Sequence, residues 1–257
     1  MKVALIQTPC ILGDKDANLS KMASVISSHD ADVFVFAELF VTGYMVRDAV
    51  FELAEDLDGE SVRRIVGLAA ERGCWIVFGM ALRHPELSGV ITNSAVAVGP
   101  EGQVHRYDKV NLANFGPFEE GLYFRPGGLP QVFPIGEHKV GLMICYDVFF
   151  SELARHYAMQ GADLMIAVSA SPTTSRRAFE TLLPARAVES TCYFTYVNQV
   201  GSQLNQVFFG GSQAYGPTGR LLSKNAYYQE DVSVIDVERE QLEIARRSRP
   251  TVRDNWS

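Results

Sequence analysis

Short apolar segments alternate with amphipathic ones along almost the whole chain. The apolar segments have the length of β-strands, and many carry no polar face; "KVGLMIC" at 139–145 is one example. A strand of that kind must be covered on both sides, and strands that alternate with helices are typical of an α/β fold. Strands are predicted at 3–8, 32–37, 75–82, 93–99, 139–145, 163–170, 192–201, 212–216 and 233–237.

Helices are predicted between these strands, from apolar residues spaced three and four positions apart. Such stripes lie within 17–30, 58–73 and 151–161. Gly73 and Gly161 are placed to end the second and third of these helices, because glycine readily adopts left-handed backbone after a last turn. Pro184 lacks an amide hydrogen, so it is predicted to divide 175–191 into two helices and to begin the second.

Two similar turns indicate that the chain has two similar halves. "GPEG" at 99–102 and "GPTG" at 216–219 each place Pro before Gly between strand-like runs, which predicts a β-hairpin at each. The apolar segments that lead to Glu38 and to Cys145 also resemble each other. We therefore predict two α/β halves packed sheet to sheet, with Glu38 and Cys145 at one rim.

Bulk properties narrow the classes of function. The net charge of −7 argues against nucleic-acid and anionic-membrane partners, and the apolar runs are too short to span a bilayer. The four cysteines and five histidines lack metal-ligand spacing, so no metal site is expected. The N-terminus turns polar too early for a signal peptide, which predicts a cytoplasmic protein with reduced thiols. Since no polar linker interrupts the chain, a single domain is predicted over 1–257.

Cys145 is the first candidate for chemistry. It ends an apolar strand and precedes a polar turn and a predicted helix, whose start would lower the thiol pKa and favour a nucleophilic thiolate. A buried core cysteine is the alternative explanation of the same residues. A Cys–His pair would need His156, whose place on the following helix does not favour it.

Three further residues have the character of catalytic groups. Glu38 follows an apolar run, where burial would raise its pKa toward that of a general base near neutral pH. Lys109 follows the first predicted hairpin and would stabilise an oxyanion, and Glu120 lies in a loop rich in Gly, Pro and aromatic residues. A solvent-facing glutamate and a surface lysine are the ordinary alternatives. The common serine-hydrolase, nucleotide-binding and zinc-protease motifs do not occur.

Taken in order, these residues and their surroundings resemble the nitrilase superfamily of carbon–nitrogen hydrolases, over nearly the whole chain. Glu38 lies in "FAELFVTGY", Lys109 in "YDKVNL", Glu120 in "NFGPFEEGLYFRPG" and Cys145 in "GLMICYDVFF". Further matches are "ARAVES", "NQVG" and "GGSQAYGPTG". Each match is weak alone, and their common order carries the resemblance.

The resemblance implies a four-layer α-β-β-α sandwich and a Glu–Lys–Cys triad of Glu38, Lys109 and Cys145, with Glu120 in support. In the implied mechanism Glu38 takes the thiol proton, the sulfur attacks an amide or nitrile carbon, and Lys109 with the backbone N–H of Tyr146 holds the oxyanion. A thioester forms and water releases the acid, so neither a metal nor an organic cofactor is required. Relatives usually dimerise, so a homodimer or higher homo-oligomer is expected.

The substrate is defined less closely. Tyr146 and Asp147 after the cysteine resemble the amidase, ω-amidase and carbamoylase branches, whereas many nitrilases have Trp-Glu there. A small linear amide is therefore expected. A nitrile, a glutaminase-like or carbamoyl-hydrolysing role, and a non-catalytic binding protein on the same fold are the alternatives.

Four residues are candidates to contact that substrate. Phe149 stands where the ω-amidase-like pattern has arginine, which disfavours a dicarboxylate monoamide and predicts an apolar pocket edge. Tyr44 and Tyr146 are expected to line the same pocket. Arg176 or its neighbour Arg177 would bind a substrate carboxylate, with a solvated arginine at a helix start as the alternative.

Overall fold

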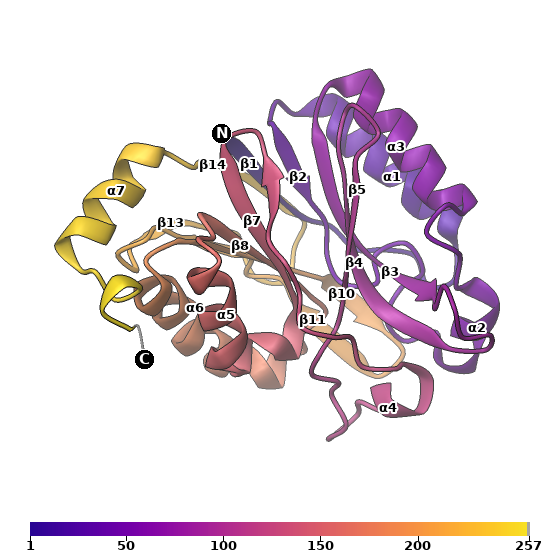
Figure 1. Ribbon diagram of the computed structural model, residues 1–257. Helices are drawn as coiled ribbons and strands as arrows, with labels where there is room; N and C mark the ends of the chain where they lie inside the picture. Colours follow the sequence, from indigo (N-terminus) through magenta and orange to yellow (C-terminus); the bar gives the residue numbers. More distant parts are fainter. Residues whose placement is uncertain (256–257) are drawn as a thin grey trace.

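The structure, a computed structural model, describes residues 1–255. Two six-stranded sheets lie face to face, and helices cover the outer face of each (Figure 1). The layers therefore follow the order α-β-β-α, as the sequence resemblance implies. None of the helices within the described residues is long and apolar enough to cross a membrane.

The strands of the two sheets are arranged alike. The first sheet has the order β14-β1-β2-β3-β4-β5, with β1 (Lys2–Gln7), β2 (Val33–Val35), β3 (Trp75–Arg83), β4 (Ile91–Val98), β5 (Val104–Asp108) and β14 (Asp231–Asp236). The second has the order β13-β12-β9-β8-β7-β6, with β6 (Phe133–Ile135), β7 (His138–Ile144), β8 (Leu164–Ser169), β9 (Tyr193–Asn198), β12 (Gln213–Tyr215) and β13 (Leu221–Lys224). A separate hairpin consists of β10 (Val200–Gln203) and β11 (Gln206–Phe209).

Four helices form the outer layers. The first sheet is covered by α1 (Lys15–Ser28) and α3 (Glu60–Arg72), and the second by α5 (Ser151–Met159) and α6 (Arg176–Ser190) (Figure 1). The other helices are α2 (Val50–Leu53), α4 (Glu120–Tyr123), α7 (Arg239–Ser248) and the 3-10 turns η1 (Arg47–Ala49), η2 (Cys145–Phe149), η3 (Thr173–Ser175) and η4 (Arg253–Asn255).

The prediction of two similar halves is confirmed. In each half, three parallel strands with helices between them lead into two antiparallel strands, and each predicted "GPxG" turn closes a hairpin, β4–β5 in one half and β12–β13 in the other. The segments before Glu38 and Cys145 are each an apolar strand, as predicted, but they do not hold equivalent places in the two halves. Glu38 follows the second parallel strand of its half, β2, whereas Cys145 follows the first strand of the other, β7.

Local signals explain one end each of α1 and α3, but not the course of α6. The Asp14 side chain accepts a hydrogen bond from the amide of Ala17 at 3.0 Å and so caps α1, and Gly73 ends α3 at a φ of +64°. The predicted break at Pro184 is wrong, because α6 continues through it. Leu183 and Ala187, on either side of the proline and one turn apart, are both buried on the sheet, so tertiary packing outweighs the lost hydrogen bond.

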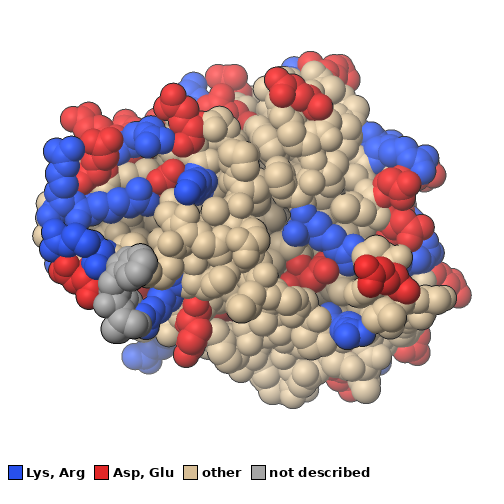
Figure 2. Space-filling model, in the orientation of Figure 1, with Lys and Arg blue, Asp and Glu red and all other residues tan. Residues whose placement is uncertain are grey.

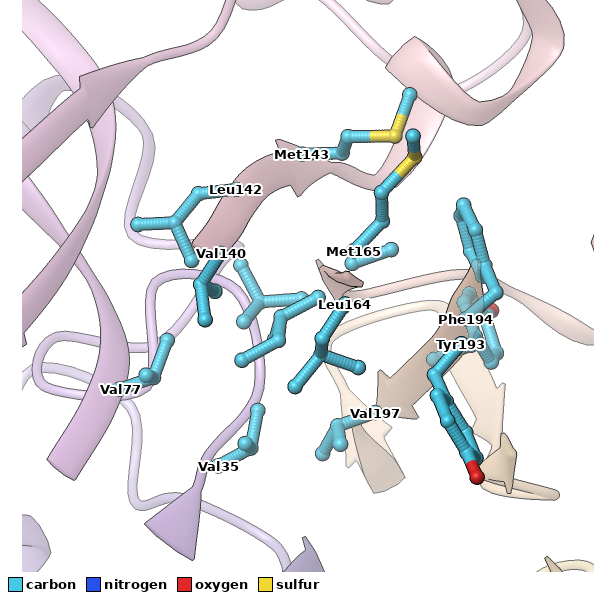
Figure 3. Close-up of a cluster of buried hydrophobic side chains, with 14 of the residues drawn as sticks. Val35, Val77, Val140, Leu142, Met143, Leu164, Met165, Tyr193, Phe194 and Val197 are labelled. Carbon is cyan, nitrogen blue, oxygen red and sulfur yellow. The ribbon is translucent and has the colours of Figure 1, made fainter. Parts of the chain in front are cut away.

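Apolar side chains from both sheets meet in the centre of the molecule. Val35 and Val77 of the first sheet point toward Val140, Leu142 and Leu164 of the second (Figure 3). A second buried cluster lies between the first sheet and its helices. Strands packed on both faces explain why so many of the predicted strand segments lack a polar face.

Candidate active site

The ends of four strands meet at one edge of the two sheets. In the first sheet, β2, β3 and β5 run in one direction, because β4 is antiparallel to both β3 and β5. Glu38 follows β2 and Lys109 follows β5, while Cys145 and Ser171 follow the parallel strands β7 and β8 of the second sheet. Both sheets therefore contribute to one site, and the prediction that Glu38 and Cys145 share a rim is confirmed.

Lys109 lies at the centre of a buried group of charges. Its Nζ is 2.9 Å from Oε1 of Glu38 and 2.7 Å from Oε1 of Glu120. The side chains of Lys109 and Glu38 are fully buried, and that of Glu120 is 3% exposed. An ammonium away from water is costly unless it is paired, so the two carboxylates hold both the charge and the position of Nζ.

Glu38 is fixed through both carboxylate oxygens. Asn93 of β4 donates its side-chain amide to Oε1 at 2.8 Å, and the backbone N–H of Ala170 donates to Oε2 at 2.8 Å. Gly79 of β3 leaves room for the backbone of Glu38 and Leu39. A Cβ at position 79 would lie 2.2 Å from the backbone nitrogen of Leu39 and 2.6 Å from Cα of Glu38. The first sheet therefore sets the position of Glu38 through Asn93, and the second sheet through Ala170.

Cys145 begins the 3-10 turn η2 directly after β7. Its φ of +46° lies in the left-handed region, which costs a non-glycine residue about 1 kcal/mol or more. Sγ is 3.4 Å from Oγ of Ser171, and the residue is 9% exposed. Arg186 of α6 supports the turn by donating from Nε to the backbone oxygen of Val148 at 2.8 Å.

Asp147 joins this turn to the segment that carries the lysine. Its Oδ2 accepts from the hydroxyl of Tyr107 at 2.7 Å and from the amide of Ile144 at 3.0 Å. Its Oδ1 accepts from the backbone and the side-chain amide of Asn111, at 2.9 and 3.0 Å. Burial raises the pKa of Asp147, while Lys109 and Tyr107 oppose that effect. One buried carboxylate thus fixes the cysteine's turn relative to the lysine's segment.

Burial and neighbouring charges set the protonation of the site. Burial raises the pKa of Glu38 above its ordinary value, although Lys109 opposes it. Burial acts to lower the pKa of Lys109, but Glu120 and Glu38 outweigh it and hold that pKa well above the usual value. Burial raises the pKa of the Cys145 thiol to about 12, with Glu38 adding to the effect and Lys109 opposing it. The lysine therefore stays charged, and the cysteine rests as a thiol.

The expectation that a helix start lowers the pKa of Cys145 is wrong. The η2 turn is short, and α5 begins only at Ser151, so burial and the nearby charge of Glu38 prevail. His156 gives no help, since its Nε2 lies 2.8 Å from the backbone oxygen of Pro130. The sulfur must therefore lose its proton as it attacks.

Two of the predicted substrate residues, Tyr44 and Tyr146, lie beside these groups. The hydroxyl of Tyr44 donates to Oε1 of Glu120 at 2.5 Å, and its backbone amide donates to the side chain of Gln203 at 2.9 Å. Tyr44 and Glu120 also line a small recess of about 40 Å³. Tyr146 follows the cysteine, and its ring centre is 5.0 Å from that of Phe115.

The other two predicted substrate residues have different surroundings. The ring of Phe149 packs edge-on against Phe179, with 5.2 Å between ring centres. The guanidinium of Arg176 lies 5.0 Å from the ring centre of Tyr227, and Arg177 is exposed. Neither arginine takes part in the buried ion pairs of Lys109 with Glu38 and Glu120.

Several residues that support the site were not found by sequence reasoning. Asn93 gave only a weak signal, because Thr92 and Ser94 on either side of it in the strand "ITNSAVAV" are polar as well. Asn198 ends β9 and accepts from the amide of Ser171 at 2.8 Å, which holds the segment beside the thiol. Ala170 acts only through its backbone amide, and no side-chain pattern could reveal it.

Comparisons with known proteins agree on one family. The family model for carbon-nitrogen hydrolases matches residues 2–247. A nitrilase of Pyrococcus abyssi is 35% identical over 247 residues, which cover 93% of this chain and 90% of that protein. An (R)-stereoselective amidase of Pseudomonas sp is 32% identical over 257 residues, with 99% and 91% covered. A variant of the amidase from Nesterenkonia sp. AN1, whose structure shows acrylamide added to the active-site cysteine, has a TM-score of 0.84 at 29% identity, with 100% of both chains covered.

The chain belongs to the carbon-nitrogen hydrolase family, within the nitrilase superfamily. It is an enzyme of the nitrilase and amidase type with a catalytic cysteine, which is Cys145 in this chain. The alternative of a non-catalytic binding protein is therefore set aside.

Proposed function

We propose that the protein hydrolyses the carbon–nitrogen bond of a small amide through a thioester on Cys145. The observation that carries the proposal is the buried Lys109, paired with Glu38 and Glu120 beside the thiol. Glu38 takes the proton from Sγ as the sulfur attacks the carbonyl carbon and a C–S bond forms. Lys109 and the backbone N–H of Tyr146 stabilise the negative charge that develops on the carbonyl oxygen.

The remaining steps return the enzyme to its resting state. The tetrahedral intermediate breaks its C–N bond, Glu38 gives its proton to the nitrogen, and ammonia or an amine leaves. Glu38 then takes a proton from water as the water attacks the thioester, the acid departs, and the sulfur regains a proton. A carboxyl group with a raised pKa suits proton transfer in both directions near neutral pH. Because Glu120 binds Lys109, its role is to hold the lysine in position.

A nitrile is the second candidate substrate, supported by the relative that is named a nitrilase. The same sulfur would add to the nitrile carbon, and two molecules of water would then be consumed to release ammonia and the acid. Glutaminase-like and carbamoyl-hydrolysing activities rank behind these two. The amide is preferred because Tyr146 and Asp147 follow the cysteine, and because Asp147 here has a defined structural role.

Ammonia release from matched amides and nitriles tests the proposal, with Cys145→Ala as the blank. We expect release from amides, none from the variant, and a wild-type mass increased by one acyl group when turnover is quenched. Release from nitriles alone would favour the second candidate. No release from either set, with no acyl adduct, would refute the mechanism.

We also propose that the chain acts as a single domain, in the cytoplasm, and as a homodimer or larger homo-oligomer with only a small molecule as its other partner. The assembly follows from the habit of the family and is tested by light scattering on the purified protein. A monomer at micromolar concentration would refute that part alone.

A further inference from the structure

Aromatic rings connect the two sides of the reaction centre. The rings of Phe208, Tyr44, Phe118, Phe115 and Tyr146 follow one another with centres 6.2, 5.9, 5.5 and 5.0 Å apart. We call these five residues the aromatic rim. They come from segments far apart in the chain, so the rim exists only in the folded protein.

The rim is attached to the catalytic groups along its length. The Tyr44 hydroxyl binds Glu120, and Tyr146 follows Cys145 in the chain. Phe208 packs in one buried cluster with Ala170, whose amide binds Glu38. The aromatic rim therefore borders the reaction centre on the side of Glu120 and on the side of Cys145.

The two cations beside the rim, Lys109 and Arg47, are accompanied by three carboxylates. Lys109 faces two carboxylates, so even with Glu38 protonated its charge is matched by Glu120. The recess beside Tyr44 is lined by one arginine, Arg47, and by two glutamates, Glu119 and Glu120. Figure 2 shows few charged side chains over the lower middle of this face, which the loop before α4 reaches in Figure 1.

We infer that the acyl group of the substrate is uncharged and apolar, and that it packs against the aromatic rim. The inference rests on the proposed amide hydrolysis and narrows its substrate class. An acyl carboxylate would lose its hydration among rings and meet an excess of negative charge, whereas a branched alkyl or aryl group would gain contact. The acid formed in the reaction carries a new charge, and the same electrostatics would favour its release.

Two amides of matched shape test the inference. 4-Methylpentanamide carries an isopropyl group where succinamate carries a carboxylate, and both release ammonia on hydrolysis. We expect kcat/KM for 4-methylpentanamide to exceed that for succinamate by ~100-fold or more, the usual scale for an unpaired charge in an apolar site. Equal values, or a preference for succinamate, would overturn the inference and leave the amidase mechanism intact. If Cys145→Ala matches the wild type on both amides, the proposed function falls as well.

Substitution of Phe115 provides the matched variants. Phe115 is 48% exposed, so its replacement should not disturb the core. Phe115→Arg adds a cation at the rim and should reduce the preference for 4-methylpentanamide at least ~10-fold, while Phe115→Met keeps the rim apolar and should retain it. An unchanged ratio in Phe115→Arg, or an equal loss in Phe115→Met, would remove Phe115 from the acyl site and overturn the inference as stated.

Discussion

The protonation of Cys145 provides the sharpest test of the mechanism. A pKa of about 12, against 9.0 for an ordinary cysteine, leaves ~1000-fold less thiolate near pH 8. If Glu38 instead already held the proton of Cys145 in the resting enzyme, the sulfur would be a thiolate and would react fully at neutral pH. The two cases predict opposite effects of Glu38→Gln on the reactivity of the Cys145 sulfur.

In Glu38→Gln the charge that disfavours the thiolate is removed while Lys109 remains. The thiol pKa should therefore fall, and reaction with methyl methanethiosulfonate, which contains no amide, should become roughly tenfold faster at a fixed pH. Amide turnover should change in the opposite direction, by about 10²- to 10⁴-fold, because the general base is lost. Thus one substitution increases the reactivity of the sulfur and nearly abolishes catalysis.

The assay follows the rate of modification from pH 6 to 11, with peptide mapping to assign the modified cysteine. Mapping is required because Cys10, Cys74 and Cys192 are also buried thiols. The reasoning would be refuted by a wild-type rate that levels off below pH 8, or by slower modification of Glu38→Gln. Either result would indicate that Glu38 stabilises the thiolate in the resting enzyme.

Three further predictions concern the groups around the triad. Since burial raises the pKa of Glu38 and the base must be ionised, kcat/KM should rise with pH along a limb whose midpoint lies above 4.5; a midpoint at or below 4.5 would contradict the burial argument. Tyr44→Phe removes the hydroxyl that donates a hydrogen bond to Glu120. Steady-state kinetics should show kcat lowered about tenfold, and thermal unfolding should show little change in Tm. An unchanged kcat would show that Glu120 does not need that contact. Gly79→Ala should lower the free energy of unfolding by ~1–3 kcal/mol in urea titrations and reduce activity, because its Cβ meets the backbone of Glu38, whereas Gly67→Ala, where nothing lies within 4 Å, should do neither.

The sequence predicted the parts of the fold that depend on local pattern. Alternating strands and helices, and the two "GPxG" hairpins, appear in the structure because hydrophobic period and turn chemistry act over a few residues. The continuous helix through Pro184 was not predictable in this way, because the packing of α6 on the second sheet outweighs the local preference of proline. α7 was also missed, since its segment "REQLEIARRS" is dominated by charged and polar residues and only Leu242 and Ala245 are buried.

For the site, the sequence predicted which residues meet but not how they are held. Glu38 and Cys145 stand at strand ends, and the ends of parallel strands converge whatever the details of packing. The thiol pKa depends on burial and on the geometry of one short turn, which no motif encodes. The amide of Ala170 contributes without any side-chain signal.

The location of the site at the junction of the two sheets has a physical consequence. The first sheet supplies Glu38 and Lys109, and the second supplies Cys145 and the amide of Ala170. The bond from Ala170 to Glu38, and the bonds from Asp147 to the segment after Lys109, cross from one half to the other. The apolar contacts between the sheets therefore set the distance between Glu38 and Cys145, and neither half holds both residues. Loosening that core should reduce activity before it unfolds the protein, because proton transfer depends on tenths of an ångström whereas the cooperative stability of the fold does not.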